Sequence, residues 1–321
     1  MFRISAYRQL PSLFATTLLV AGLTAAQALT TAGPNRPAAV PEDYIITPFG
    51  YFHASCVQQL AEGDVLLKDE NAIRHADGRF DSMHVCEYAH YKANGEAVAA
   101  TKTPVDPPSI SHAWIEYASV TTSTSSFGAL TANWTVPPAP SANNGQTVYL
   151  FPGMEDYKDV VTIIQPVLGW NSDFRYAWGI ASWNCCKNGT VYESSPVSVK
   201  SGDLIYGVMK DTCAAGTLSC GSCNITTEDV TTGKSTTLSN TSSQGQTFNW
   251  AFAGALEVYN IAQCADFPSN GAIVYSSLDL YNDSFVTIAN PAWSVTNASA
   301  GLTPQCSYGG SETPTSVKLT Y

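Results

Sequence analysis

Two polar side chains, a carboxyl group and an amide, lie inside apolar stretches of the sequence, where they could take part in catalysis. Glu257 lies in the run Ala255-Leu256-Glu257-Val258-Tyr259. Burial raises the pKa of a carboxyl group, which makes Glu257 a candidate acid and base. Gln165 follows a β-branched run from Val160 to Ile164. Its amide does not titrate, but it has two donors and one acceptor that could orient a water or stabilise an oxyanion. A glutamine here could equally be a cross-strand hydrogen bonder.

The histidines exclude several other kinds of catalytic site. All five, His53, His75, His84, His90 and His112, precede Trp114. Ser-His-Asp and Cys-His sites and histidine-ligated metals are therefore excluded from the region beyond, unless His112 at its edge contributes. Cys213, Cys220 and Cys223 do not supply the four thiolates of a structural zinc site. We predict neither a bound metal nor another cofactor.

The other carboxyl groups beyond Trp114 mostly lie beside predicted turns. Glu155-Asp156, Asp203 and Asp229 are examples. In such positions we expect solvated or capping acids rather than reactive ones.

The elements that must position Gln165 and Glu257 are β-strands. From Trp114 onward, short apolar runs alternate with segments rich in Gly, Pro, Asn and Ser, and no 3.6-residue periodicity extends beyond a turn or so. One strand is predicted around Val160 to Leu168 and a second from Phe174 to Trp183, joined by a turn at Asn171-Ser172-Asp173. The pattern predicts an all-β fold, an antiparallel β-sandwich of the concanavalin or jelly-roll type, over residues 109–321.

The N-terminus has the pattern of a secretory signal peptide over residues 1–28. Arg3 and Arg8 precede an apolar run from Leu13 to Leu23, and Ala26-Gln27-Ala28 follows. The apolar run is too short to span a bilayer. We therefore expect a secreted, extracellular protein without a membrane anchor.

Residues 29–108 form a predicted N-terminal module with a linker. Prolines open the segment, Cys56 and Cys86 can form a disulfide within it, and Thr103 to Pro108 is a stiff, extended linker. The module is either a propeptide or a structural extension of the mature protein. It contains His53, His75, His84 and His90, and we expect it to cover the groove of the sandwich at neutral pH and to loosen in acid.

Composition narrows the class of partner. The net charge is −11, and 13% of the residues are charged. An acidic surface with few charges is a poor partner for nucleic acid and for anionic membranes. The small number of carboxylates also suits an acidic environment. We expect a monomer.

Cysteine use and glycosylation motifs agree with export. Nine cysteines leave one unpaired. We predict Cys264–Cys306 as a second disulfide and do not expect the adjacent Cys185 and Cys186 to pair with each other. Sequons occur at Asn133, Asn188, Asn224, Asn240, Asn282 and Asn297.

A set of motifs between Trp134 and Leu280 resembles the glutamic peptidases of the eqolisin family. In order, the matching segments are Ile164-Gln165, Ala177-Trp178 to Trp183, Ser201-Gly202-Asp203-Leu204-Ile205, Thr231-Thr232-Gly233-Lys234-Ser235 and Leu256-Glu257-Val258. The resemblance implies a secreted acid endopeptidase that hydrolyses peptide bonds of polypeptide substrates with a Gln165 and Glu257 dyad and an activated water. We predict that Trp134, Trp170, Trp178 and Trp183 bind the substrate.

The sequence also departs from that family. Pro166 follows Gln165 and lacks an N–H donor, so we expect an edge strand or a bulge at this point. Glu257 lacks the tryptophan that usually follows the catalytic glutamate. The Cys56 to Cys86 module and the insertion from Cys264 to Phe267 are more similar to larger secreted relatives of the neprosin type.

Other functions are compatible with the same fold. A non-catalytic, lectin-like carbohydrate-binding protein could use Trp170, Trp178, Trp183 and Trp250 as stacking platforms. A retaining glycosidase would need two carboxyl groups about 5 Å apart, and no matching motif occurs. A secreted protein with a decayed peptidase site is a third alternative. The distance between the Gln165 amide and the Glu257 carboxyl group distinguishes the peptidase from the binding protein. If both face one groove within reach of one water, the peptidase is favoured; if they lie on opposite faces, the binding protein is favoured.

Overall fold

The structure, a computed structural model, describes residues 36–67, 72–83, 85–99, 113–158, 163–186 and 189–321. The predicted signal peptide, the linker from Thr103 to Pro108, His84, His112 and Asn188 lie outside the described residues.

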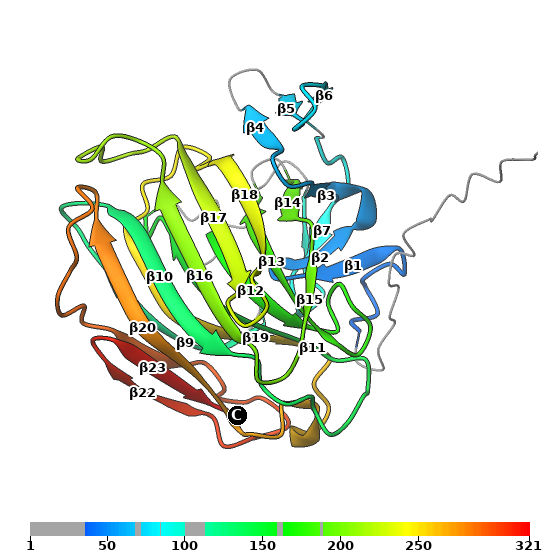
Figure 1. Cartoon of the computed structure of the whole chain (residues 1–321). Helices are drawn as coiled ribbons and strands as arrows, with labels where there is room; N and C mark the ends of the chain where they lie inside the picture. The colour runs from blue at the N-terminus through cyan, green and yellow to red at the C-terminus, as the bar shows by residue number, and fades with distance from the viewer. Residues whose placement is uncertain (1–35, 68–71, 84, 100–112, 159–162, 187–188) are drawn as a thin grey trace, which may run out of the picture.

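A ten-stranded sheet forms one layer of the sandwich. Its strand order is β22-β23-β20-β10-β16-β17-β18-β4-β5-β6. The strands are β22 (Gly309–Thr313), β23 (Ser316–Thr320), β20 (Ala272–Asn282), β10 (Phe127–Thr135), β16 (Leu204–Asp211), β17 (Ser222–Asp229), β18 (Lys234–Ser242), β4 (Val65–Leu67), β5 (Ala72–Arg74) and β6 (Phe80–Ser82). In Figure 1 the strands from β20 to β18 lie in front of the second layer, and β4 to β6 project above it.

A nine-stranded sheet forms the second layer. The order is β21-β9-β19-β11-β12-β13-β14-β3, with β15 paired to β13. The strands are β21 (Ser294–Asn297), β9 (Trp114–Thr121), β19 (Trp250–Tyr259), β11 (Thr147–Glu155), β12 (Ile163–Trp170), β13 (Trp178–Cys185), β14 (Val191–Ser194), β3 (Val57–Leu60) and β15 (Val197–Val199).

A small four-stranded sheet from the N-terminal region completes the fold. It consists of β1 (Tyr44–Thr47), β2 (Gly50–His53), β7 (His90–Tyr91) and β8 (Ala97–Val98). The 3₁₀ turns η1 (Ala54–Cys56) and η5 (Cys264–Asp266) are short, and the part of the chain that the structure describes contains no α-helix. The prediction of an all-β, antiparallel sandwich is confirmed.

The N-terminal module is joined to both large sheets. Strand β3 pairs in parallel with β14, with Glu193 opposite Gln59. Strand β4 pairs in parallel with β18 at Ser239 and Val65. The module therefore adds strands to both large sheets of the sandwich.

The nine-stranded sheet is buried on both faces. Along β11, Val148 and Leu150 belong to the core between the two large sheets, here called the interior core. The intervening Tyr149 and Phe151 belong to a second apolar cluster with Tyr51 and other residues of the module. We call this second side, which carries Tyr149, Phe151, Val167, Ala181 and Trp183, the module face. A strand buried on both sides has a nearly continuous apolar sequence, as β12 and β13 do.

The expectation of an edge or bulge at Pro166 is wrong. Strand β12 lies between β11 and β13, and its pairing with β13 is unbroken from Ile163 to Trp170. Strand β12 pairs with β11 on both sides of Pro166, with Leu168 opposite Leu150 and Ile164 opposite Met154. Between these two pairs the ladder is interrupted, and Pro166 is opposite Pro152. Two prolines opposite each other both lack the N–H donor, so the ladder skips this level without ending the sheet.

The disulfides confirm both predicted pairs, Cys56–Cys86 and Cys264–Cys306. Cys213 pairs with Cys220, and Cys223 is a buried free thiol. Cys185 and Cys186 are joined to each other across a cis peptide bond, contrary to the expectation. Disulfides are typical of exported proteins. Among the described residues no helix is long and apolar enough to cross a membrane.

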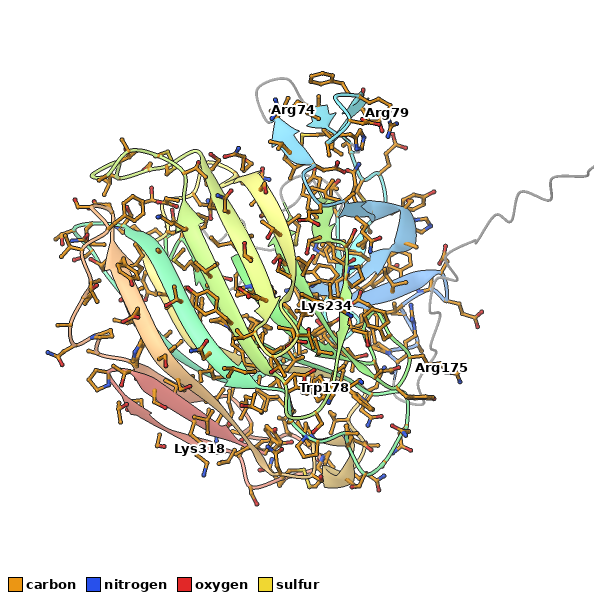
Figure 2. The ribbon with its side chains drawn as sticks, in the orientation of Figure 1. Arg74, Arg79, Arg175, Trp178, Lys234 and Lys318 are labelled. Carbon is orange, nitrogen blue, oxygen red and sulfur yellow. A yellow bond between two sulfur atoms is a disulfide. The ribbon has the colours of Figure 1, made fainter. Side chains whose placement is uncertain are left out.

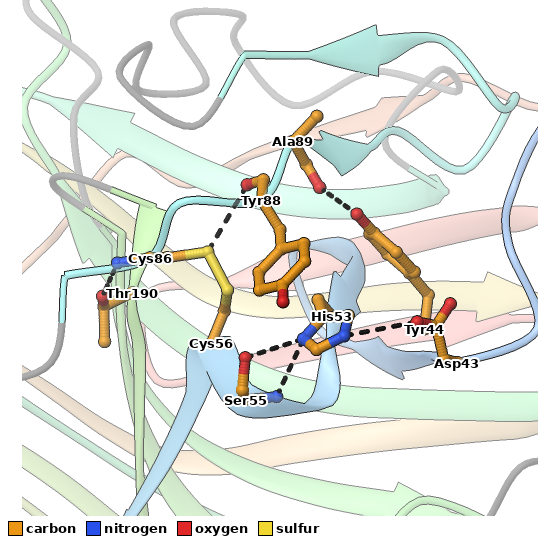
Figure 3. The surroundings of a disulfide bond; sticks show 9 residues. All are labelled: Asp43, Tyr44, His53, Ser55, Cys56, Cys86, Tyr88, Ala89 and Thr190. Atoms are coloured by element: carbon orange, nitrogen blue, oxygen red, sulfur yellow. Dashed lines mark hydrogen bonds and ion pairs between the residues drawn. A yellow bond between two sulfur atoms is a disulfide. The ribbon is translucent and has the colours of Figure 1, made fainter.

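Figure 3 shows the surroundings of the first disulfide, Cys56–Cys86, which lies within the module and beside Thr190 of the sandwich. The Cys86 backbone N–H donates to the Thr190 hydroxyl, just before β14, at 3.2 Å. The rings of His53 and Tyr88 stack beside the bridge at 3.8 Å. The disulfide therefore fixes Cys86 within the module, and the Cys86 N–H contacts the edge of the nine-stranded sheet that β3 extends.

Candidate functional site

Gln165 lies near the centre of the module face. Strand β12 places it directly opposite Trp183 of β13. The side chain is fully buried, and neither its Oε1 nor its Nε2 has a hydrogen-bond partner. Because most buried polar groups are paired, an amide with both ends free in an apolar environment requires an explanation. The alternative that Gln165 is a satisfied cross-strand hydrogen bonder does not describe this side chain.

Glu257 lies on the same face of the sheet. Strand β19 places it opposite Tyr149 of β11 and Trp114 of β9. The carboxyl group is fully buried, its Oε1 accepts a 2.5 Å hydrogen bond from the Tyr259 hydroxyl, and its Oε2 has no partner. Burial raises the pKa of Glu257 well above its ordinary value, although the Tyr259 hydrogen bond opposes this. Burial therefore favours the protonated form of Glu257 relative to a solvent-exposed glutamate.

The structure does not bring Gln165 and Glu257 into contact. Tyr149, which is opposite Glu257, is also opposite Gly169 on β12. Gln165 is four residues from Gly169, which corresponds to about 13 Å along the strand, and β11 lies between β12 and β19. The two side chains share a face, as the peptidase hypothesis requires, but a single water cannot bridge them in this arrangement.

The four tryptophans predicted to bind substrate divide between two environments. Trp134, Trp170 and Trp178 belong to the interior core, where Trp170 and Trp178 pack edge to face at 5.4 Å. Trp178 is labelled in Figure 2 among the densely packed side chains of the sandwich. Trp183 lies on the module face beside Gln165. Among the four, Trp183 alone is positioned to contact a ligand on that face, and the interior rings cannot serve as exposed sugar platforms.

Further carboxyl groups lie on the module face. Glu155 was expected to be a solvated or capping acid, and this is wrong: it is 5% exposed, and burial raises its pKa to about 8. Asp203 and Asp229 do cap turns, because they accept hydrogen bonds from the backbone N–H groups of Lys200 and Thr231. Glu155 alternates along the strand with Tyr149, Phe151 and Gly153, so its side chain points to the same face as theirs. The sequence alone does not show that this face is buried, so the alternation could not identify Glu155 as a buried acid.

Glu193 is another buried acid that the sequence analysis missed. It lies opposite Trp183, on β14, and its Oε1 has no partner. Burial, together with the neighbouring and hydrogen-bonded Asp173, raises the pKa of Glu193 well above its ordinary value. Gln59 of the module also hydrogen-bonds to it. Glu193 therefore has partners from both the module and the loop that precedes β13.

The N-terminal module covers this face. The Tyr149 hydroxyl donates to the Ile46 carbonyl oxygen at 3.2 Å. The ring of Phe49 packs edge-on against Trp183 at 6.1 Å, and Tyr51 packs in the same way against Tyr259 at 5.5 Å. These contacts exclude solvent from Gln165 and Glu257.

The described residues hold no group of three or more His, Cys, Asp or Glu side chains that could bind a metal ion. His75 contacts two aspartates, Asp64 at 3.0 Å and Asp81 at 2.8 Å. The hydrogen bonds to Asp81 and then to Asp64 raise the pKa of His75. Protonation in acid therefore strengthens these contacts within the module, which opposes the predicted loosening.

The comparisons with known proteins found similarity in structure alone. No family model and no curated protein matches the sequence. A crystal structure of scytalido-glutamic peptidase with a peptide-based transition-state analogue matches with a TM-score of 0.45 and 16% identity. SCP-B, a member of the eqolisin family of peptidases in complex with the tripeptide Ala-Ile-His, matches with a TM-score of 0.44 and 19% identity. Scytalido-glutamic peptidase with a transition-state analogue inhibitor matches with the same two values. Each match covers 65% of this chain and 97% of the solved one. The chain is thus similar in structure, at low sequence identity, to peptidases of the eqolisin family.

Proposed function

We propose that this protein is a secreted peptidase that hydrolyses peptide bonds of polypeptides in acid, with its active site on the module face. The observation that carries the proposal is the Gln165 amide, fully buried and without a partner at either end, on a face that also holds Glu257, a carboxyl group whose pKa burial raises. Leaving a buried donor or acceptor unpaired costs about 1–3 kcal/mol. Such groups are retained where they act on a ligand that is absent from the closed state.

The chemistry needs a base that takes a proton from water, donors for the oxyanion and an acid for the leaving amine. An amide N–H of Gln165 can donate to the oxyanion. A carboxyl group of the module face can take the proton and return it to the nitrogen. The sequence motifs favour Glu257, which must approach Gln165 from its position about 13 Å away along the strands of the closed form before both can act on one peptide bond. When the cover leaves, water reaches this carboxyl, the desolvation that raises its pKa decreases, and the group can ionise in mild acid.

We also propose that residues 29–108 are a propeptide that keeps the site closed. The contacts of Ile46, Phe49 and Tyr51 with the module face support this role. Because the His75 contacts strengthen in acid, we infer that cleavage of the chain, rather than pH alone, removes the cover. The disulfides and the exposed sequon asparagines Asn224, Asn240 and Asn297 fit secretion.

The test uses the full chain with a specific protease site in place of residues 103–108. Cut and uncut forms are incubated at about pH 3.5 with denatured haemoglobin, and new amino termini are counted. The cut form should hydrolyse the substrate faster than the uncut form, Gln165→Ala should lower the rate about 10²–10³-fold, and Glu257→Gln should remove activity. Pepstatin, which inhibits paired aspartates, should have no effect. The absence of any peptide hydrolysis by either form would reject the proposed function.

A further inference from the structure

The module face also carries a pair of carboxyl groups, Asp173 and Glu193, that the mechanism above does not use. One row of side chains crosses four strands at the level of Gln165: Gln165 on β12, Trp183 on β13, Glu193 on β14 and Gln59 on β3. Two strand spacings separate Gln165 from Glu193, which corresponds to about 10 Å. Glu193 therefore lies beyond Trp183, at the far end of the row from the amide.

The loop before β13 brings Asp173 to this row. Gly169 and Gly179 are opposite each other below the loop. A Cβ at Gly169 would lie 2.8 Å from the Ser172 Cβ, and a Cβ at Gly179 would lie 2.6 Å from the Phe174 Cδ2. The two glycines therefore let the loop lie close against the module face, where the Asp173 carboxyl hydrogen-bonds to the carboxyl group on β14.

No cation balances this pair in the part of the chain that the structure describes. The ion pairs between described residues all lie within the N-terminal module. Arg175, two residues from Asp173, is exposed and lies over the Tyr176 ring at 5.1 Å. Glu193 is 5% exposed, and its Oε1 has no hydrogen-bond partner. A buried carboxyl oxygen without a donor is unusual in a folded protein and points to a ligand that donates to it.

The module supplies a donor of the kind that this position accepts. Gln59 is directly opposite Glu193, and its side chain hydrogen-bonds to the Glu193 carboxyl group. This hydrogen bond lowers the pKa of Glu193, although burial and Asp173 raise it more. A Lys or Arg side chain offers the same N–H donors together with a positive charge, and charge-assisted hydrogen bonds are stronger than neutral ones.

The pair retains a negative charge in mild acid once the cover leaves. Burial raises the pKa of Asp173, and its hydrogen bonds to Glu193 and Ser172 oppose this. Exposure to water removes the desolvation, so Asp173 ionises first and Glu193 keeps the shared proton, because two adjacent carboxylates repel each other. Tyr149 of β11 also faces the pair, and its raised pKa keeps it neutral.

We propose that Asp173 and Glu193 form a subsite that binds a basic side chain, Lys or Arg, of the polypeptide substrate. This inference rests on the proposed peptidase function and names its substrate class. The Trp183 ring lies between Gln165 and the pair, so it can contact the aliphatic stem of the basic residue and stabilise its charge. The cationic group then takes the place of Gln59 at Glu193.

The first experiment tests the pair without hydrolysis, in the uncut chain. Gln59→Lys places a cation at the pair, and the exposed position of Gln59 leaves room for the longer side chain. The variant should raise the Tm at pH 6 by about 2–4 °C. The uncharged control Gln59→Met should give no increase. An equal increase for Gln59→Lys in a Glu193→Gln background would overturn the assignment of the pair.

The second experiment measures kcat/KM of the cut full chain at pH 3 and pH 5. The peptides differ only in Lys or Met at one position, which is moved along the sequence around the cleaved bond. At one position the Lys peptide should be favoured about 10–100-fold, and more at pH 5 than at pH 3, because Asp173 ionises over this range. Glu193→Gln and Asp173→Asn should each reduce this ratio. Glu312→Gln, at an exposed acid of β22, is the matched control and should leave the ratio unchanged.

The outcomes separate this inference from the proposed function. If the peptides are hydrolysed without a preference for Lys at any position, the subsite is wrong and the peptidase function stands. If neither peptide is hydrolysed, the proposed function and this inference both fail. If Glu193→Gln fails to fold, judged by circular dichroism, Asp173→Asn in the partly exposed loop decides: an unchanged ratio would overturn the subsite.

Discussion

The two faces of the nine-stranded sheet bury similar apolar side chains but treat polar groups differently. On β13, Ser182 and Asn184 point into the interior core, and both bond to the ten-stranded sheet, Ser182 to Thr227 at 3.0 Å and Asn184 to Thr241 at 2.6 Å. On the module face, Gln165, Glu155 and Glu257 each retain at least one unpartnered polar atom.

This difference separates structural from functional burial. The polar side chains of β13 that point into the interior core, Ser182 and Asn184, have hydrogen-bond partners, as is usual for buried polar groups. The indole N–H groups of Trp134, Trp170 and Trp178 in the same core have none. The amide and carboxyl groups of the module face have partners only in part. Under the proposed function, these groups would gain partners when a substrate replaces the module.

The largest expected effect on stability tests the interior core. Leu168 is fully buried between the two large sheets. Leu168→Ala should lower the free energy of unfolding by about 2–5 kcal/mol, because it removes apolar contacts and leaves a cavity. Denaturant titration of the full chain measures this change. A loss under about 1 kcal/mol would show that the interior is not the principal core.

The second prediction contrasts the two kinds of buried polar group. Ser182→Ala should destabilise the protein by about 1–3 kcal/mol, because it leaves the Thr227 hydroxyl without this partner. Gln165→Leu should be neutral or stabilising in the same titration, since it removes an amide with no partners. Equal destabilisation by both variants would contradict the distinction between the faces.

The third prediction concerns pH. Burial raises the pKa of Glu155 and Glu116 to about 8 and that of Asp211 to about 7. A raised carboxyl pKa means that the folded state binds protons more tightly than the unfolded state, so stability is full below the ordinary value near 4.5 and decreases as the pH rises toward about 8. The Tm of the full chain should therefore fall between pH 5 and pH 8.

The variants Glu155→Gln and Glu116→Gln provide the control for that titration. Each variant should show a smaller decrease in Tm between pH 5 and pH 8 than the wild type. Glu312→Gln at the surface should leave the dependence of Tm on pH unchanged. A Tm that stays constant over this range would mean that these carboxyl groups are ionised in the folded protein as they are in the unfolded chain.

The smallest expected effect tests the cover. Phe49→Ala removes an edge-to-face contact with Trp183, and such aromatic pairs contribute about 0.5–1.5 kcal/mol beyond area burial. The variant should exchange the backbone amides of β1 and β2 faster than the wild type, with no change in β20. Hydrogen exchange read by mass spectrometry measures this difference. Uniform exchange across all strands would show that the module does not open separately.

The class of the fold and the residue types available for chemistry could be predicted from the amino-acid sequence. Short apolar runs with turn residues predicted an all-β sandwich, and the predicted Cys56–Cys86 and Cys264–Cys306 disulfides are present, although counting cysteines does not fix their connectivity. The absence of histidine beyond Trp114 directed attention to Gln165 and Glu257. These properties are local, so they can be read from a single chain.

Which of these residues lie near one another depends on how the strands pair. Because β11, β12 and β13 are buried on both sides, their two-residue alternation is hidden in continuous apolar sequence and does not reveal which side chains share a face. The pairing register, set by contacts distant in sequence, placed Glu155 diagonal to Gln165 and Glu257 four positions away. It also put Trp134, Trp170 and Trp178 in the interior core. A shift of one residue would have exchanged the two faces, which is why the site depends on the register of the sheet.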